Sequence, residues 1–195
     1  LGDEAVTISD TSLAVATLNT LNGNTTGVVN AATVTTLTGG AAAMNTAYTA
    51  GGNGEISNLG NEAITLDDTT LAVATLNTLN GNTTGIVNAA SVATLTGLAA
   101  DVNTTYVANI AGTITGLADE AVTISDTTIR ADVLNTLNGY TTGVVDASSV
   151  TILTGTYLDV NTSYAGNTES TISGLGNEAV TLNDLSISAT NLSSI

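Results

Sequence analysis

The residues of this chain that could do chemistry are its acids, seventeen of them against a single arginine. A glutamate and, six residues later, an aspartate recur in LGDEAVTISD and in three further copies of that segment. The glutamates are Glu4, Glu62, Glu120 and Glu178, and the aspartates are Asp10, Asp68, Asp126 and Asp184. Hard cations bind where carboxylates and carbonyls cluster, so these two rows predict Ca²⁺ sites as one candidate.

A second interpretation of the aspartates is structural, and we favour it. Each one precedes a segment with helical spacing, where a carboxylate can cap the free backbone N–H groups and meet the positive end of the helix dipole. No EF-hand loop or other dense run of ligands accompanies them. Calcium therefore stays the alternative to capping at these positions.

Enzymatic chemistry is disfavoured by composition and by repetition. The chain has no histidine and no cysteine, which removes the commonest general base and the thiolate nucleophile. Two carboxylates could serve a glycosidase, but a catalytic pair should be singular, whereas these acids return in every copy. We therefore expect a non-enzymatic protein with no cofactor other than the calcium alternative.

The acids are positioned by a repeat of fixed length. LGDEAVTISD at residue 1 returns as LGNEAITLDD at 59, LADEAVTISD at 117 and LGNEAVTLND at 175, each 58 residues after the last. A constant period of this size predicts a repeat architecture. We expect one solenoid domain over residues 1–195, with repeats 1–58, 59–116 and 117–174 and a partial repeat 175–195.

Two helices are expected in each repeat. Ile129, Leu134 and Leu137 fall on one face of a helix, and Gly139 suits the left-handed position just past its end. The first helices are predicted at 11–22, 69–80 and 127–138. The second helices are predicted at 40–48, 98–107 and 156–164. Short β-branched segments between turn residues predict two strands before each second helix, and another at Ile56, Ile114 and Ile172.

These elements predict an α/β solenoid in which each repeat holds two strand–strand–helix coils of about 29 residues. An all-β solenoid is the alternative. Residues at equal phase should form structural ladders, with the amides bonding one another or the backbone at turns. The asparagine ladders are Asn19, Asn77 and Asn135, and Asn45, Asn103 and Asn161; the tyrosine ladder is Tyr48, Tyr106 and Tyr164. The Thr pairs, such as Thr25–Thr26, are expected in turns.

The charge and hydropathy of the chain limit the classes of partner that it can bind. With a formal net charge of −16 and no basic patch, we expect no binding to nucleic acid. No apolar run approaches the length of a membrane span, so no membrane insertion is expected. Solenoid ends without polar caps expose strand edges. We therefore expect end-to-end self-assembly between copies, or further repeats in a longer parent chain.

The motifs EAVTISDT, LNTLNGNTTGVV, VTTLTG and DVNT resemble repeats of very large secreted or surface proteins of marine bacteria. Some of those proteins carry calcium-binding RTX nonapeptides and act as adhesins. The nonapeptide itself is absent here, and GGNGEI at 51–56 is its nearest counterpart. The resemblance implies an extracellular or cell-surface location and a role as rod, spacer or filament-forming adhesive unit. The alternative it leaves open is a calcium- or glycan-binding module of a surface adhesin.

Overall fold

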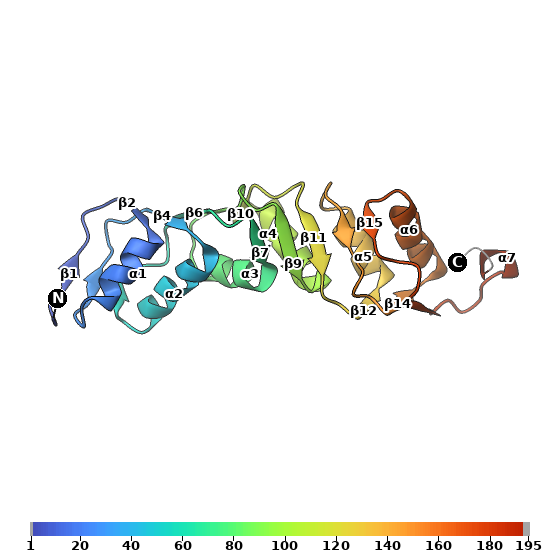
Figure 1. Ribbon diagram of the computed structural model, residues 1–195, viewed down its shortest axis with the longest axis horizontal. Helices are drawn as coiled ribbons and strands as arrows, with labels where there is room; N and C mark the ends of the chain where they lie inside the picture. The colour runs from blue at the N-terminus through green and yellow to red at the C-terminus, as the bar shows by residue number, and fades with distance from the viewer. Residues whose placement is uncertain (1, 193–195) are drawn as a thin grey trace. The chain divides into compact units, whose positions relative to one another are not determined.

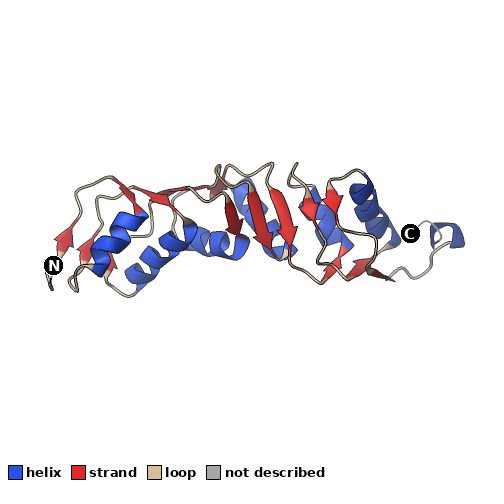
Figure 2. Cartoon of the chain, viewed as in Figure 1, coloured by secondary structure: helices blue, strands red, loops and turns tan. Residues whose placement is uncertain are grey.

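The computed structural model of the chain describes residues 2–192. Short parallel strands alternate with helices along the sequence (Figures 1 and 2). The contacts divide the chain into two compact units, which are described separately below. Unit 1 comprises Leu1–Val92 and Val107–Leu117, and unit 2 comprises Ala93–Tyr106 and Ala118–Ile195. The fold class is therefore α/β with parallel sheets, and the all-β alternative is wrong.

Seven helices form in the described part of the chain. They are α1 Val15–Gly23, α2 Ala41–Gly52, α3 Val73–Asn82, α4 Ala99–Ala111, α5 Ala131–Asn138, α6 Tyr157–Thr168 and α7 Ala189–Leu192. The second helix of each repeat is confirmed, although α2, α4 and α6 each extend beyond the predicted end. None of these helices combines the length and the apolar character needed to cross a membrane.

The first helix of each repeat begins about four residues later than predicted. Its expected first turn is instead a short strand, as in Thr70–Ala72, where only Leu71 is buried and its two neighbours are exposed. Alternation of exposed and buried residues with a period of two is typical of a strand. The pairing of such strands, for example of Leu13 with Leu37, outweighs the local helical spacing. The prediction of a left-handed Gly139 is also wrong, because its φ is −79°.

Unit 1 holds two open parallel sheets. In one the strand order is β1–β3–β5, and in the other it is β2–β4–β6–β8–β10. The strands of these two sheets are β1 Val6–Thr7, β2 Ser12–Ala14, β3 Val29–Asn30, β4 Thr36–Gly39, β5 Ile56–Ser57, β6 Ala63–Leu66, β8 Val87–Asn88 and β10 Ile114–Thr115. The short strand β7, Thr70–Ala72, belongs to neither of them. The two strands predicted before each second helix are confirmed, as are those at Ile56, Ile114 and Ile172. The coil that leads to α3 contains three strands, β5, β6 and β7, where two were expected.

Unit 2 has the same pairing at positions 58 residues later. Its strands are β9 Thr94–Gly97, β11 Ala121–Ile124, β12 Thr128–Arg130, β13 Val145–Asp146, β14 Ile152–Gly155, β15 Ile172–Ser173 and β16 Ala179–Leu182. β9, β11, β13 and β15 pair in that order, and β12, β14 and β16 form a second sheet. Strand pairings of unit 1 therefore recur in unit 2 at equivalent positions of the sequence repeat.

The core of each unit is a column of aliphatic side chains that occupy equal register positions. In unit 1, Leu37, Ile64, Val87 and Ile114 are paired in register and at most 1% exposed. Leu95, Val122, Val145 and Ile172 form the matching column in unit 2. Burying each such side chain contributes about 1.5–3 kcal/mol relative to exposure. Helices cover the columns through residues such as Met44 and Val160, both fully buried.

Candidate functional site

The first buried carboxylate is that of Glu62, in the segment just before β6. Its Oε2 atom accepts hydrogen bonds from the backbone N–H groups of Gly60 and Asn61 at 2.9 and 3.2 Å. The Tyr48 hydroxyl, on the buried face of α2, donates to the same oxygen at 3.0 Å. A charge buried without partners is strongly destabilising, and these three donors offset that effect.

Unit 2 contains the same arrangement twice. Tyr106 donates to Glu120 Oε2 at 3.0 Å, and the Ala118 N–H group donates to that oxygen at 3.0 Å. Glu178 accepts from the N–H groups of Gly176 and Asn177 at 2.7 and 3.0 Å. Burial alone would raise the pKa of Glu178, but the hydrogen bonds from Tyr164 and from these backbone groups hold that pKa below its usual value. Each Tyr–Glu pair therefore ties a second helix to the start of the next repeat.

A threonine completes the Glu62 and Glu120 networks from a third point in the chain. The Thr83 hydroxyl donates to the Glu62 backbone oxygen at 2.9 Å and accepts from the Gly85 N–H group at 2.9 Å. Thr141 makes the same two contacts with Glu120 and Gly143, at 2.7 and 2.9 Å. The expectation that the Thr pairs lie in turns is thereby supported. The network joins residues 14 and 21 positions from the glutamate in sequence.

The tyrosines of these networks have raised pKa values. Burial raises the pKa values of Tyr48, Tyr106 and Tyr164 above the ordinary value of about 10, and the neighbouring glutamates add to the effect. Since the folded state holds these protons more tightly than the unfolded chain, their contribution to stability is complete below about pH 10 and is lost as the pH rises through the folded pKa.

An alkaline titration followed by phenolate absorbance should therefore show delayed ionisation. We expect three of the five tyrosines to ionise only as the helical circular dichroism signal is lost. Tyr106→Phe should reduce this late fraction by one tyrosine. Ionisation of all five residues with the dichroism unchanged would contradict the assignment.

The aspartate row caps helices, but not the helices that follow it in sequence. Asp68 Oδ2 accepts from the Ala41 N–H group at 2.7 Å, at the start of α2. In unit 2, Asp126 accepts from Ala99 at 2.8 Å and Asp184 from Tyr157 at 2.7 Å. Each partner lies 27 residues earlier. The predicted capping of the following helix is therefore wrong, because the residues after each aspartate form a strand or loop that separates it from that helix.

Glu4 and Asp10, the first members of the two acid rows, make fewer side-chain hydrogen bonds than the later members. Glu4 is exposed, and its carboxylate accepts from the Gly2 N–H group at 2.5 Å. Hydrogen bonds from nearby backbone N–H groups, its own first, lower the pKa of Glu4. No described residue donates a hydrogen bond to the Asp10 side chain.

Residues 2–192 contain no dense set of calcium ligands, because no three acids among them lie in a metal-binding geometry. The glutamates accept from N–H and O–H donors, whereas the aspartates face helix N-termini. The Oε1 atoms of Glu62 and Glu178 are buried and receive no hydrogen bond from the described residues. These two atoms could accept a cation, and calcium stays a prediction.

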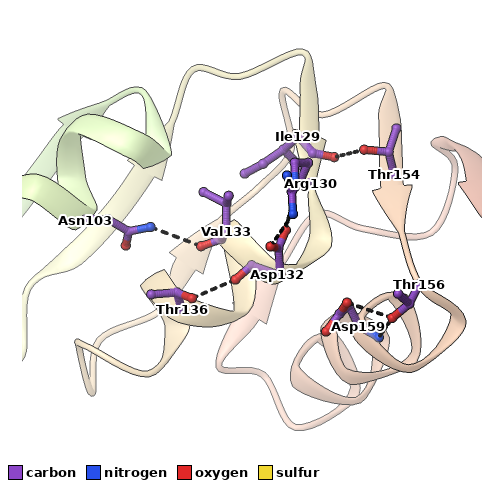
Figure 3. Close-up of polar contacts among 9 residues, drawn as sticks. All are labelled: Asn103, Ile129, Arg130, Asp132, Val133, Thr136, Thr154, Thr156 and Asp159. Atoms are coloured by element: carbon purple, nitrogen blue, oxygen red, sulfur yellow. Dashed lines mark hydrogen bonds and ion pairs between the residues drawn. The ribbon is translucent and has the colours of Figure 1, made fainter. Parts of the chain in front are cut away.

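The asparagines connect neighbouring helices rather than identical side chains. In unit 1, the Nδ2 of Asn19 on α1 donates to the Ala43 carbonyl of α2 at 2.9 Å, and that of Asn45 donates to the Thr75 carbonyl of α3 at 3.1 Å. In unit 2, Asn103 donates to the Val133 carbonyl at 3.2 Å (Figure 3). Asn135 donates to the Asp159 carbonyl at 2.9 Å. Asn77 is half-buried on α3 and Asn161 is exposed on α6. Within each unit, members of the two predicted asparagine ladders thus alternate from one helix to the next.

The tyrosines of the predicted ladder likewise contact other residues rather than one another. The hydroxyls of Tyr48 and Tyr106 donate to glutamates, and Tyr106 stacks on Tyr140 with ring centroids 5.6 Å apart. Tyr140 occurs only in the third copy of the repeat, and the equivalent residues of the first two copies are Asn24 and Asn82.

The single arginine forms a surface pair that the sequence analysis did not identify. Arg130 Nε and Nη2 donate to the two carboxylate oxygens of Asp132 at 2.9 and 2.6 Å (Figure 3). The arginine hydrogen bond is the main cause that lowers the pKa of Asp132. Both side chains are exposed, and solvent screens their attraction, so the pair contributes little to stability. Its signal in the sequence is the spacing Arg-x-Asp at the junction of β12 and α5.

One open groove in unit 1 is lined mostly by residues with polar side chains. It has a volume of about 440 Å³ and lies between α1 and α2, which are neighbours (Figure 1). Its floor and rim carry amides, hydroxyls and one carboxylate, that of Glu55. Asn22 and Asn53 donate to the two Glu55 oxygens at 3.0 and 3.5 Å. Position 55 becomes Thr113 and Thr171 in later copies, so this acid is not part of the repeat.

Comparison with protein-family models, with curated proteins and with solved structures finds no match for this chain.

Proposed function

We propose that this chain is an α/β solenoid segment with a non-enzymatic, structural role in an extracellular repeat protein, acting as rod, spacer or fibre-forming unit. The observation that carries the proposal is the use of the repeated acids. Glu62 and Glu120 are buried against tyrosines, and Asp68 and Asp126 cap helices 27 residues earlier. Side chains that recur to join one coil to the next have a mechanical role and leave no common reaction centre.

The strand pairing supports the same proposal. The order β4–β6–β8–β10 of unit 1 recurs 58 residues later in unit 2 as β9–β11–β13–β15. Neither unit needs a closed sheet to bury its aliphatic column. In solenoids each repeat contacts only its neighbours, so the number of repeats can vary. The extracellular location rests on the resemblance to repeats of secreted and surface proteins of marine bacteria. A charge of −16 favours a saline medium, where repulsion between exposed acids is screened.

Changing the number of repeats tests the proposal. Removing residues 59–116 places Glu120 where Glu62 stood, so Tyr48 keeps a carboxylate partner 14 positions away. Duplicating the same residues adds one repeat with identical contacts. We expect both variants to fold with an unchanged ratio of helix to strand by circular dichroism. Solution scattering should show the maximum dimension falling and rising by equal amounts, and an unchanged dimension in a folded duplication variant would contradict a solenoid.

The alternative is a calcium- or glycan-binding module, and the groove at Glu55 favours it. Calcium chloride and sodium chloride at matched ionic strength separate the two functions. General screening gives equal unfolding midpoints in both salts. A rise in midpoint with calcium that Glu62→Gln or Glu55→Gln removes would favour the binding module.

A further inference from the structure

An asparagine near the end of α4 connects that helix to the segment that follows it. The Nδ2 atom of Asn109 donates to the Leu117 carbonyl at 3.0 Å, and its Oδ1 atom accepts from the Leu117 N–H group at 3.3 Å. In the next copy, the Oδ1 atom of Asn167 accepts from the Leu175 N–H group at 3.2 Å. A primary carboxamide can make two bonds to one residue because an N–H donor and the carbonyl oxygen lie on the same edge.

The first copy of the repeat lacks this side chain. Position 51 is glycine, and no described residue makes a hydrogen bond with the N–H group or the carbonyl of Leu59, which is equivalent to Leu117 and Leu175. The Leu59 side chain is half-buried, whereas Leu117 and Leu175 are 5% and 9% exposed. Backbone donors and acceptors that leave water need a partner. Glycine at position 51 therefore leaves one donor and one acceptor of Leu59 open to a ligand.

An open pocket of about 380 Å³ lies at these two groups, within unit 1. Tyr48, Ile56 and Leu59 contribute apolar surface to it, and none of its lining residues is an acid or a base. A Cβ atom at Gly51 would lie 3.7 Å from the Ile56 carbonyl oxygen and 3.7 Å from Leu59 Cδ1, which are ordinary contacts. The pocket therefore has room at Gly51 for the carboxamide that Asn109 carries in the second copy.

The two groups of Leu59 select one class of ligand. A carboxylate can accept from the N–H group but cannot donate to the carbonyl, and a chain with a net charge of −16 repels anions. A guanidinium or ammonium group can donate to the carbonyl but cannot accept from the N–H group. A trans secondary amide has its N–H and carbonyl on opposite edges, so it reaches only one of the two. Among these groups, only a primary carboxamide matches both.

We propose that the pocket at Gly51 binds a neutral ligand through a primary carboxamide, which takes the place of the asparagine side chain missing from the first copy. The ligand donates to the Leu59 carbonyl and accepts from the Leu59 N–H group, as Asn109 does with Leu117. This group occurs on small free amides and on the asparagine and glutamine side chains of protein partners. The proposal goes beyond the structural role proposed above and does not depend on it, because it uses contacts within unit 1 alone.

Three small probes that differ in one group test the site by NMR. Acetamide has the heavy atoms of the missing side chain, acetate lacks the donor, and N-methylacetamide has its N–H and carbonyl on opposite edges. We expect acetamide at millimolar concentrations, as suits so small a ligand, to shift the Leu59 amide resonance saturably. Hydrogen exchange of that amide should slow about twofold at half saturation, because only the free form exchanges. Acetate and N-methylacetamide should produce neither change.

Two substitutions interchange the properties of the first and second copies. Gly51→Asn supplies the carboxamide from the chain itself, so it should slow exchange at Leu59 without a ligand and abolish the acetamide shift. Asn109→Gly should create the same site at Leu117, whose resonance acetamide then shifts. The matched control is Gly23→Asn, which adds the same side chain outside the pocket, at a position where a Cβ meets nothing within 4 Å. This variant should bind acetamide as the natural chain does.

A peptide distinguishes the two sources of the carboxamide. The probe is a blocked tripeptide with a central glutamine, and its control has glutamate at that place. Affinity for the glutamine peptide at least about tenfold above that for acetamide would assign the site to a protein side chain, since the peptide also contacts the apolar wall. Equal affinities would assign it to a free small amide.

The absence of an acetamide response at Leu59 would overturn the proposal, as would equal responses to all three small probes. An acetamide shift of full size in the Gly51→Asn variant would also overturn it. None of these results bears on the repeat architecture, which the variants with one repeat removed or added test separately.

Discussion

Gly85→Ala should destabilise the protein by about 3 kcal/mol or more, because a Cβ atom at this position has no room. The added carbon would lie 2.1 Å from the Glu62 carbonyl oxygen and 2.8 Å from the Ala63 nitrogen. Both atoms belong to the backbone that leads into β6, so no flexible side chain can move aside. Gly27 and Gly143 meet the same obstacle at 2.3 and 2.2 Å from Glu4 and Glu120. A thermal or urea unfolding midpoint measures the loss.

Gly81→Ala is the matched control for this substitution, four residues away. Gly81 lies within α3, and an added Cβ there meets nothing within 4 Å. Alanine restricts the unfolded chain and favours a helix, so we expect stabilisation of about 0.5–1 kcal/mol. Equal midpoints for the Gly81→Ala and Gly85→Ala variants would show that the close approach of the backbone at Gly85 is not what requires glycine.

Glu120→Ala should lower the free energy of unfolding by about 3 kcal/mol. The substitution leaves the Tyr106 hydroxyl and the Ala118 N–H group without their acceptor, and it opens a cavity at a side chain that is 1% exposed. Asp119→Asn, at the exposed neighbouring position, removes the same charge and should change stability by no more than about 0.5 kcal/mol.

A double-mutant cycle separates the hydrogen bond from the cavity. Tyr106→Phe removes the donor and should reduce the free energy of unfolding by about 1–2 kcal/mol. With Glu120 already replaced by alanine, the same change should have a much smaller effect, which leaves a coupling of at least about 1 kcal/mol. Additive losses in the cycle would mean that Tyr106 and Glu120 stabilise the protein independently of one another.

The sequence by itself determined the repeat and most of the local structure. A period of 58 residues is read directly from the copies, and helical spacing placed α2, α4 and α6 to within a few residues at their starts. Short β-branched segments between turn residues predicted β4, β9 and β14. The helices and strands depend on residues close together in sequence, which is why a local pattern can reveal them.

The tertiary structure decided which partner each repeated side chain takes. Asp68 is near a predicted helix in sequence, yet it caps α2, which begins 27 residues earlier. Leu71 fits a helical face, yet it lies in a strand. Strand pairing and helix packing bring together residues that are 14, 21 and 27 positions apart. The spacing of residues within one helix or strand does not specify such partners, so these contacts became visible only in the folded chain.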